Sequence, residues 1–113
     1  MCYNFKIVSR TQNGIIVKTN CDIYQLSYKN LNFNLTKTEF DSFLAYLIKI
    51  DCNYWEKEYE NSIYEKKIPI PTLQSNFIIL LDKIELFELI TLMKSSTEEF
   101  LRFKDFNNLD FWN

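Results

Sequence analysis

The sequence predicts one α+β domain over residues 1–113, a mainly antiparallel sheet of about six strands with two principal helices packed on one face. Three observations lead to this fold class. The first part of the chain alternates apolar and polar residues between short turns, as antiparallel strands do. Two later segments have apolar residues at helical spacing behind a capping box. A short apolar run precedes the second of them, so the expected order is ββββα-ββα with a short C-terminal helix or tail.

Four strands joined by tight turns form the expected meander. We place them at residues 5–10, 15–19, 23–28 and 31–35. The turn signal is clearest at Asn13-Gly14, because both residues tolerate positive φ and the pair favours a β-hairpin. Alternation also assigns side chains to the two faces of each strand. The aromatic residues that it assigns to the core are Phe5, Tyr24, Tyr28 and Phe33.

The first helix is expected to begin after Thr36. Thr36 and Glu39 form a capping box, in which each side chain bonds the backbone N–H of the other residue. Asp51 and Asn53 indicate a break, and a second short helix is expected to continue from there to the region of Glu60. The apolar stripe of the first helix consists of Phe40, Phe43, Leu44, Leu47 and Ile48.

The second half of the chain returns to strands and a helix. Residues 68–71 read Ile-Pro-Ile-Pro, which favours an extended edge segment because proline donates no ladder hydrogen bond. Residues 77–81 are continuously apolar, which favours a central strand covered on both faces. Asp82 and Glu85 form a second capping box, and the helix behind it is expected to end at Ser95-Ser96. Its apolar stripe consists of Leu86, Leu89, Ile90 and Met93.

A shift of 46 residues superposes two parts of the chain. The two capping boxes then coincide, and so do the apolar stripes of the two helices. Leu31, Phe33 and Leu35 fall on Phe77, Ile79 and Leu81. The pattern indicates an internal repeat of strand, cap and helix. Two unrelated strand–helix junctions share such a pattern for physical reasons, so common ancestry stays open.

The composition excludes several kinds of active site. The chain has no His and one Gly, so it forms no imidazole base, no His-containing zinc site and no glycine-rich phosphate loop. Cys2, Cys21 and Cys52 are odd in number and widely spaced, which favours reduced thiols over a disulfide framework. A metal site would need all three cysteines and a carboxylate to converge. We expect no metal, no cofactor and no enzymatic activity.

Hydropathy and charge bear on compartment and partners. The longest apolar run has five residues, whereas a spanning helix needs ~20, and no secretory signal opens the chain. We therefore expect a cytoplasmic protein with no membrane contact. The formal net charge of −2 divides into +4 over residues 1–37 and −6 over residues 38–113. Lys6, Arg10 and Lys18 are candidate polyanion-binding residues, although two differently solvated faces are the simpler explanation of this asymmetry.

Aromatic residues gather at the end of the chain. Residues 97–113 contain Phe100, Phe103, Phe106, Phe111 and Trp112. So many aromatic side chains are expected to dock, either on the core of their own chain, on a partner or on a second copy. Tyr54 and Trp55 are a second candidate contact, although Trp55 fits better as a continuation of the helical core stripe.

Two hypotheses of function follow. The first is a non-catalytic protein–protein interaction module, either an accessory subunit or a homodimer, that uses the aromatic residues of 97–113 and Tyr54 with Trp55. The alternative is small-ligand or nucleic-acid binding through the basic sheet face. Nucleic acid is the less favoured ligand, because stacking platforms need aromatic side chains on that same face and the alternation assigns them to the core.

The order of these motifs resembles a family of small uncharacterised bacterial proteins, a domain of unknown function. The resemblance covers residues 2–94 and rests on a short Cys-containing strand, a turn with Gly and the segment 21–30, Cys-Asp-Ile-Tyr-Gln-Leu-Ser-Tyr-Lys-Asn. A strand and a helix opened by an acid-Phe pair, here Glu39-Phe40, complete it. The resemblance implies no catalytic residue. The Asn-, Lys-, Ile- and Phe-rich composition is also typical of an AT-rich bacterial genome.

Overall fold

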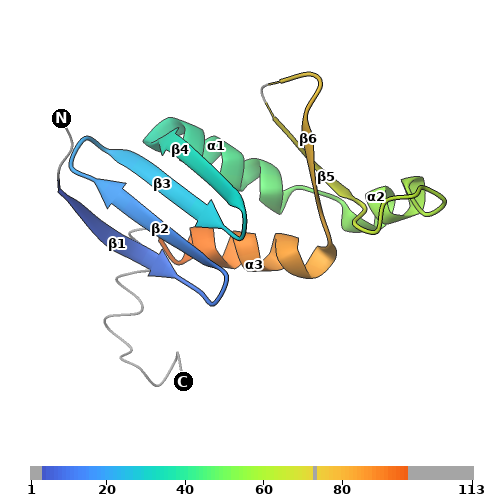
Figure 1. Cartoon of the computed structure of the whole chain (residues 1–113), viewed down its shortest axis with the longest axis horizontal. Coiled ribbons are helices and arrows are strands. Elements are labelled where there is room, and N and C mark those ends of the chain that lie inside the picture. The colour runs from blue at the N-terminus through green and yellow to red at the C-terminus, as the bar shows by residue number, and fades with distance from the viewer. Residues whose placement is uncertain (1–3, 73, 97–113) are drawn as a thin grey trace.

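The computed structural model describes residues 4–72 and 74–96 (Figure 1). Its strands are β1 (Phe5–Arg10), β2 (Gly14–Thr19), β3 (Ile23–Tyr28), β4 (Leu31–Thr36), β5 (Ile68–Pro71) and β6 (Ile78–Leu81). Its helices are α1 (Lys37–Ile48), α2 (Cys52–Glu58) and α3 (Lys83–Lys94). The predicted order of strands and principal helices is confirmed, with α2 as the predicted short helix after the break. None of the described helices has the length and hydropathy needed to span a bilayer.

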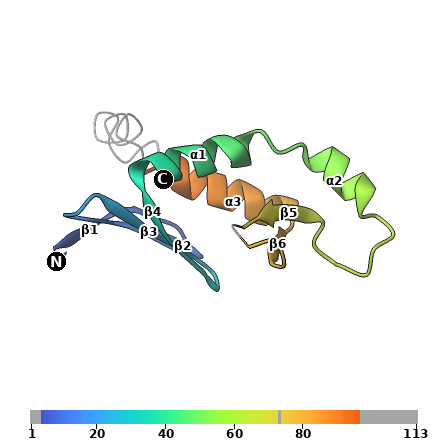
Figure 2. The ribbon, with the colours of Figure 1, turned by 90° about the horizontal axis from the view of Figure 1, so that it is seen from above.

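The strands form two antiparallel sheets. β1, β2, β3 and β4 pair in chain order, and β5 pairs with β6 in a separate hairpin. α1 and α3 lie together over one face of the larger sheet, as Figure 2 shows. The α+β class and the one-sided helix layer are therefore confirmed, while the six predicted strands divide between two sheets. The second hairpin stands beyond the larger sheet, beside the N-terminal end of α3 (Figures 1 and 2).

The core lies between the larger sheet and the two long helices. The side chains that are almost fully buried include Ile16, Leu26, Tyr28, Phe40, Leu47, Leu89, Leu92 and Met93. Two predictions about the core are wrong. Phe5 is 66% exposed because it lies on the outer face of the sheet edge, and Ile48 is half-exposed because α1 ends there. Tyr24 and Tyr28 are buried and Phe33 packs against the core, as predicted.

Gly14 is required for close packing rather than for its φ angle. The hairpin at Asn13-Gly14 is present, but the positive φ angles lie at Asp22 and Lys29, in the next two turns. A Cβ on Gly14 would lie 2.7 Å from Leu92 Cδ2 and 2.9 Å from the carbonyl oxygen of Ser27. The backbone of β2 thus approaches α3 closely at this point, which only glycine permits.

Both predicted capping boxes are present. The Thr36 hydroxyl accepts from the Glu39 N–H at 3.1 Å, and the Asp82 carboxylate accepts from the Glu85 N–H at 2.7 Å. Each glutamate in turn accepts from the backbone of its cap residue. The helices behind the boxes have 12 residues each, although the strands that precede them belong to different sheets.

The prediction that residues 77–81 form a central strand covered on both faces is wrong. β6 pairs with β5 alone, and Phe77 and Ile78 are 57% and 53% exposed. Within β6 only Leu81 is buried, while Ile79 packs against the core and stays partly exposed. Since Pro69 and Pro71 alternate in β5, that strand donates few ladder hydrogen bonds and extends the sheet no further.

Candidate functional site

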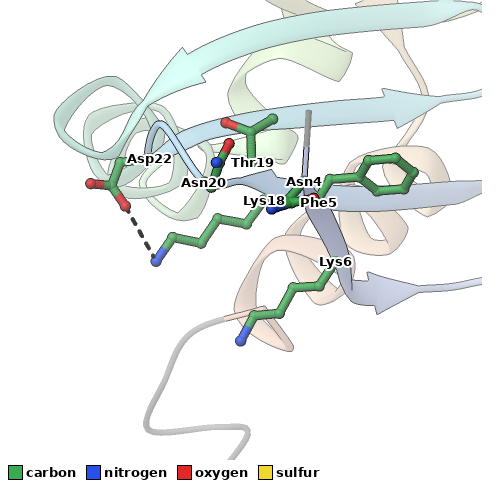
Figure 3. A pocket seen from close by; sticks show the side chains of 7 residues that line it. All are labelled: Asn4, Phe5, Lys6, Lys18, Thr19, Asn20 and Asp22. Carbon is green, nitrogen blue, oxygen red and sulfur yellow. Dashed lines mark ion pairs between the residues drawn. The ribbon is translucent and has the colours of Figure 1, made fainter. Parts of the chain in front are cut away.

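A basic hollow lies at the end of the β1–β2 edge of the sheet. Its volume is about 330 Å³, and its lining comes from Asn4, Phe5, Lys6, Lys18, Thr19, Asn20 and Asp22. Lys6 and Lys18 are direct cross-strand partners. Figure 3 shows their side chains leaving the two strands on the same side, while Phe5 points another way. The sheet register therefore brings two ammonium groups to one small open site.

The β2–β3 turn shapes one wall of this hollow. The buried Thr19 hydroxyl accepts hydrogen bonds from the N–H groups of Cys21 and Ile23, at 3.3 and 3.2 Å. The Asn20 N–H donates to the Asn4 carbonyl at 3.0 Å and so continues the strand pairing past β1. Asp22 has a φ of 61°, which turns the chain back into β3. Short polar residues fit here because they bond the local backbone and tolerate positive φ.

The two lysines differ in their partners. Lys18 Nζ lies 3.8 Å from a carboxylate oxygen of Asp22 and 5.7 Å from the ring centroid of Tyr24. Tyr24 packs on Phe40 of α1 with ring centroids 4.7 Å apart, so this is the helix-covered side of the sheet. In the described part of the chain, no carboxylate forms an ion pair with Lys6.

The prediction that Arg10 shares a face with Lys6 and Lys18 is wrong. A β-bulge between Ile7 and Ser9 shifts the register of β1, and Arg10 pairs with Ile15. Ile15 and Lys18 are three residues apart on β2, so their side chains lie on opposite faces of the sheet. Simple alternation along β1 could not reveal this, because one inserted residue reverses the side of every residue beyond it.

An apolar groove lies on the outer face of α3. Its volume is about 480 Å³, and its lining comes from Thr11, Lys83, Ile84, Phe87, Glu88 and Thr91. Ile84 and Phe87, one helical turn apart, are 73% and 72% exposed. This face was not predicted from the sequence, because the core stripe already accounts for most apolar residues of the helix. Ile84 and Phe87 lie outside that stripe at helical spacing, which is the signal that could have revealed a second apolar face.

A buried carboxylate of α3 pairs with two partly exposed lysines, one from the β3–β4 turn and one from the connector before β5. Glu85 is 3% exposed, and its Oε2 accepts from Lys29 Nζ at 2.6 Å and from Lys66 Nζ at 2.8 Å. Burial favours the neutral acid, but the hydrogen bonds from both lysines and from the Asp82 backbone outweigh it and lower the pKa of Glu85 to about 2. The same hydrogen bond raises the pKa of Lys29. From the sequence, Glu85 had only the role of a capping residue.

A second carboxylate of α3 holds the buried Tyr28. Glu88 accepts from the Tyr28 hydroxyl at 2.5 Å and from Asn13 Nδ2 at 3.1 Å. Burial, and then the hydrogen bond to Glu88, raise the pKa of Tyr28 well above its ordinary value. Every group in the two glutamate clusters is thus paired with a partner inside the protein. The geometry indicates that they fasten the β1–β2 and β3–β4 turns to α3 rather than carry out chemistry.

Tyr54 and Trp55 of α2 lie together away from the main core. Their rings meet edge to face at 4.9 Å, and Trp55 stacks on Tyr59 at 5.8 Å. Tyr54 is half-exposed, and α2 has no fully buried residue. The candidate residues Phe100, Phe103, Phe106, Phe111 and Trp112 lie outside the described residues.

The cysteines do not form a metal centre in the part of the chain that the structure describes, where no group of three or more metal-ligating residues occurs. Cys21, at the exposed β2–β3 turn, is disulfide-bonded, so the prediction of reduced thiols is wrong at this residue. Cys2 lies outside the described residues. Cys52 is a free thiol whose pKa is raised by burial, which makes it a poor nucleophile near neutral pH.

Comparison with known proteins gives one family and no function. The model of a family described only as being of unknown function matches residues 1–113. No curated protein and no solved structure matches the chain.

Proposed function

Since the chain belongs to the family of unknown function DUF6686, which transfers no activity, we propose from the geometry that it is a non-catalytic protein–protein interaction or accessory-subunit module. The observation that carries the proposal is the exposed apolar face of α3. Ile84 and Phe87 line a groove of about 480 Å³ while more than two thirds of each side chain faces solvent. Covering such a side chain is worth ~1.5–3 kcal/mol, so this face favours a docked partner.

The occupant that we propose is the aromatic segment 97–113 of a second copy of the chain. α3 ends at Lys94, so this segment begins within one helical turn of the end of α3. It brings five aromatic residues, the side chains that dominate interface energetics. In a twofold symmetric pair, each copy offers the same groove and the same segment. The contact is then made twice, as in the common isologous dimer.

The test is the oligomeric state of the full chain with a variant of the groove. We expect light scattering to give a dimer at high protein concentration, and Phe87→Gln to shift it to a monomer by at least about tenfold in dissociation constant. The matched control is Ile63→Gln, because Ile63 is 95% exposed in the connector before β5 and far from the groove in sequence. This variant should dimerise like the parent.

Two results would count against the proposal. In the first, the full chain is monomeric at every concentration and Phe87→Gln changes neither its mass nor its melting temperature. The groove would then have no occupant. A monomer whose melting temperature falls in Phe87→Gln would place the segment on its own chain and exclude the second copy.

Tyr54 and Trp55 support a further contact of the same module, since both rings stand on a helix with no buried residue.

Nucleic-acid binding has less support. Lys6 and Lys18 remain together, but Arg10 faces the other way and Asp22 stands at the rim of the hollow. Duplexes and long single strands are bound by many cationic contacts spread along a surface. Two lysines at one end of a sheet do not make such a surface.

A further inference from the structure

We propose that the hollow around Lys6 and Lys18 binds a compact oxyanion, the phosphate or carboxylate group of a small molecule. This site is separate from the α3 groove and independent of the proposed interaction function. Its lining combines two ammonium groups with the side-chain amides of Asn4 and Asn20 in about 330 Å³. That volume lies at the lower end of the ~300–1,000 Å³ usual for small-molecule sites.

The register of the two lysines favours an anion in the hollow. Like charges directly opposite each other on neighbouring strands destabilise a sheet. β1 and β2 nevertheless pair Lys6 with Lys18, and both side chains extend to the same side (Figure 3). An oxyanion between the two ammonium groups converts this repulsion into two charge-assisted hydrogen bonds.

The positive charge of the two lysines is incompletely neutralised by the described residues. Asp22 is exposed and lies 3.8 Å from Lys18, at the outer limit of an ion pair. No carboxylate among the described residues pairs with Lys6. Within residues 4–72 and 74–96, Lys6 therefore has no carboxylate partner and Lys18 is only loosely engaged. An arriving anion displaces no buried ion pair of these residues.

The size of the hollow favours a single compact anion. The hollow is bounded by the strand ends and the β2–β3 turn, and Arg10 lies on the opposite face of the sheet. The cationic residues thus line one small hollow instead of following a line along the surface. One phosphate or carboxylate group fits such an arrangement, whereas an extended polyanion needs contacts that continue beyond it.

The test is a titration of the full chain with inorganic phosphate and, separately, with acetate, at constant ionic strength, followed by backbone amide NMR shifts. We expect saturable shifts at Lys6, Lys18 and Asn20. The Lys6→Met variant should bind phosphate about tenfold or more weakly. Because Lys6 is exposed and the repulsion is removed, this variant should melt no lower than the parent. Tighter binding of phosphate or of acetate identifies which group the site prefers.

Two further variants make the result specific. Lys49→Met removes an exposed lysine at the opposite end of α1 and should leave phosphate binding unchanged. Asp22→Asn keeps a residue that tolerates positive φ and frees Lys18, so binding should tighten severalfold. Shifts that rise without saturation, or that are the same in Lys6→Met and Lys49→Met, would reduce the effect to general ionic screening and overturn the proposal.

Discussion

At the scale of single residues, Glu85 combines a capping role with two ion pairs. It completes the capping box of α3, and it receives the ammonium groups of Lys29 and Lys66 on one oxygen atom. These lysines come from the β3–β4 turn and from the connector before β5. One buried carboxylate thus links the β3–β4 turn and the connector before β5 to the start of α3.

The first prediction concerns Glu85→Gln. The amide can still accept the capping hydrogen bond, but the charge is lost. Since the pKa of Glu85 is lowered from 4.5 to about 2, the ionised carboxylate contributes up to roughly 3 kcal/mol to folding. A lowered carboxyl pKa stabilises the fold fully above the ordinary value. The difference between parent and variant in urea unfolding should therefore be largest at pH 7 and disappear as the pH falls from 4.5 towards 2.

The matched control for this prediction is Glu39→Gln. Glu39 has the same place in the capping box of α1, but it is exposed and forms no ion pair among the described residues. We expect it to cost below about 1 kcal/mol at every pH. An equal loss of stability in the two variants, or a loss in Glu85→Gln that persists at pH 2, would assign the effect to capping instead of charge.

At the scale of elements, the sequence predicts local features well. The capping boxes at Thr36 and Asp82, the turn at Lys29-Asn30 and the break at Asp51 depend on residues within one helical turn, and all are present. The errors depend on distant pairing. The bulge in β1 places Arg10 on the face opposite to Lys6. The apolar strand β6 pairs with β5 alone among the described strands. No short window of sequence contains those partners.

The candidate sites depend on distant or irregular pairing in the same way. The regular register that starts at Arg10 and Ile15 would pair Lys6 with Thr19, so only the bulge between Ile7 and Ser9 brings Lys6 opposite Lys18, and their common face could not be predicted. The cluster around Glu85 could not be predicted either, since Lys29 lies 56 residues away along the chain. The groove of α3 was predictable only in part. Ile84 and Phe87 have helical spacing, but which apolar face of a helix turns to the core is decided by the sheet it meets.

A prediction about the second hairpin follows from its two-stranded form. Isolated two-stranded hairpins are marginally stable, and here only Ile68, Pro69, Ile70 and Leu81 of the hairpin strands are buried. In native-state hydrogen exchange, the amides of β6 should be protected at least about tenfold less than those of the central strand β3. Equal protection of β3 and β6 would mean that both sheets open only when the whole domain unfolds.

At the scale of the whole molecule, the described residues close a core without the final segment. Sheet, α1 and α3 enclose the buried residues, and α3 is fastened near its end, where the Ser9 hydroxyl donates to the Leu92 carbonyl at 2.8 Å. A chain cut after Ser96 keeps all of these contacts. What it loses is the aromatic segment 97–113, and with it the occupant proposed for the groove of α3.

We therefore expect the chain that ends at Ser96 to remain folded and to become monomeric. Its circular dichroism spectrum should stay that of an α+β domain, and its unfolding free energy should fall by no more than about 2 kcal/mol, because no residue of the described core is removed. Light scattering on the same samples measures the oligomeric state. Phe87→Gln in the shortened chain should then change neither measurement, because the groove has already lost its occupant. Unfolding of the shortened chain would instead make residues 97–113 part of the core, and exclude their role as a segment that docks on a second copy.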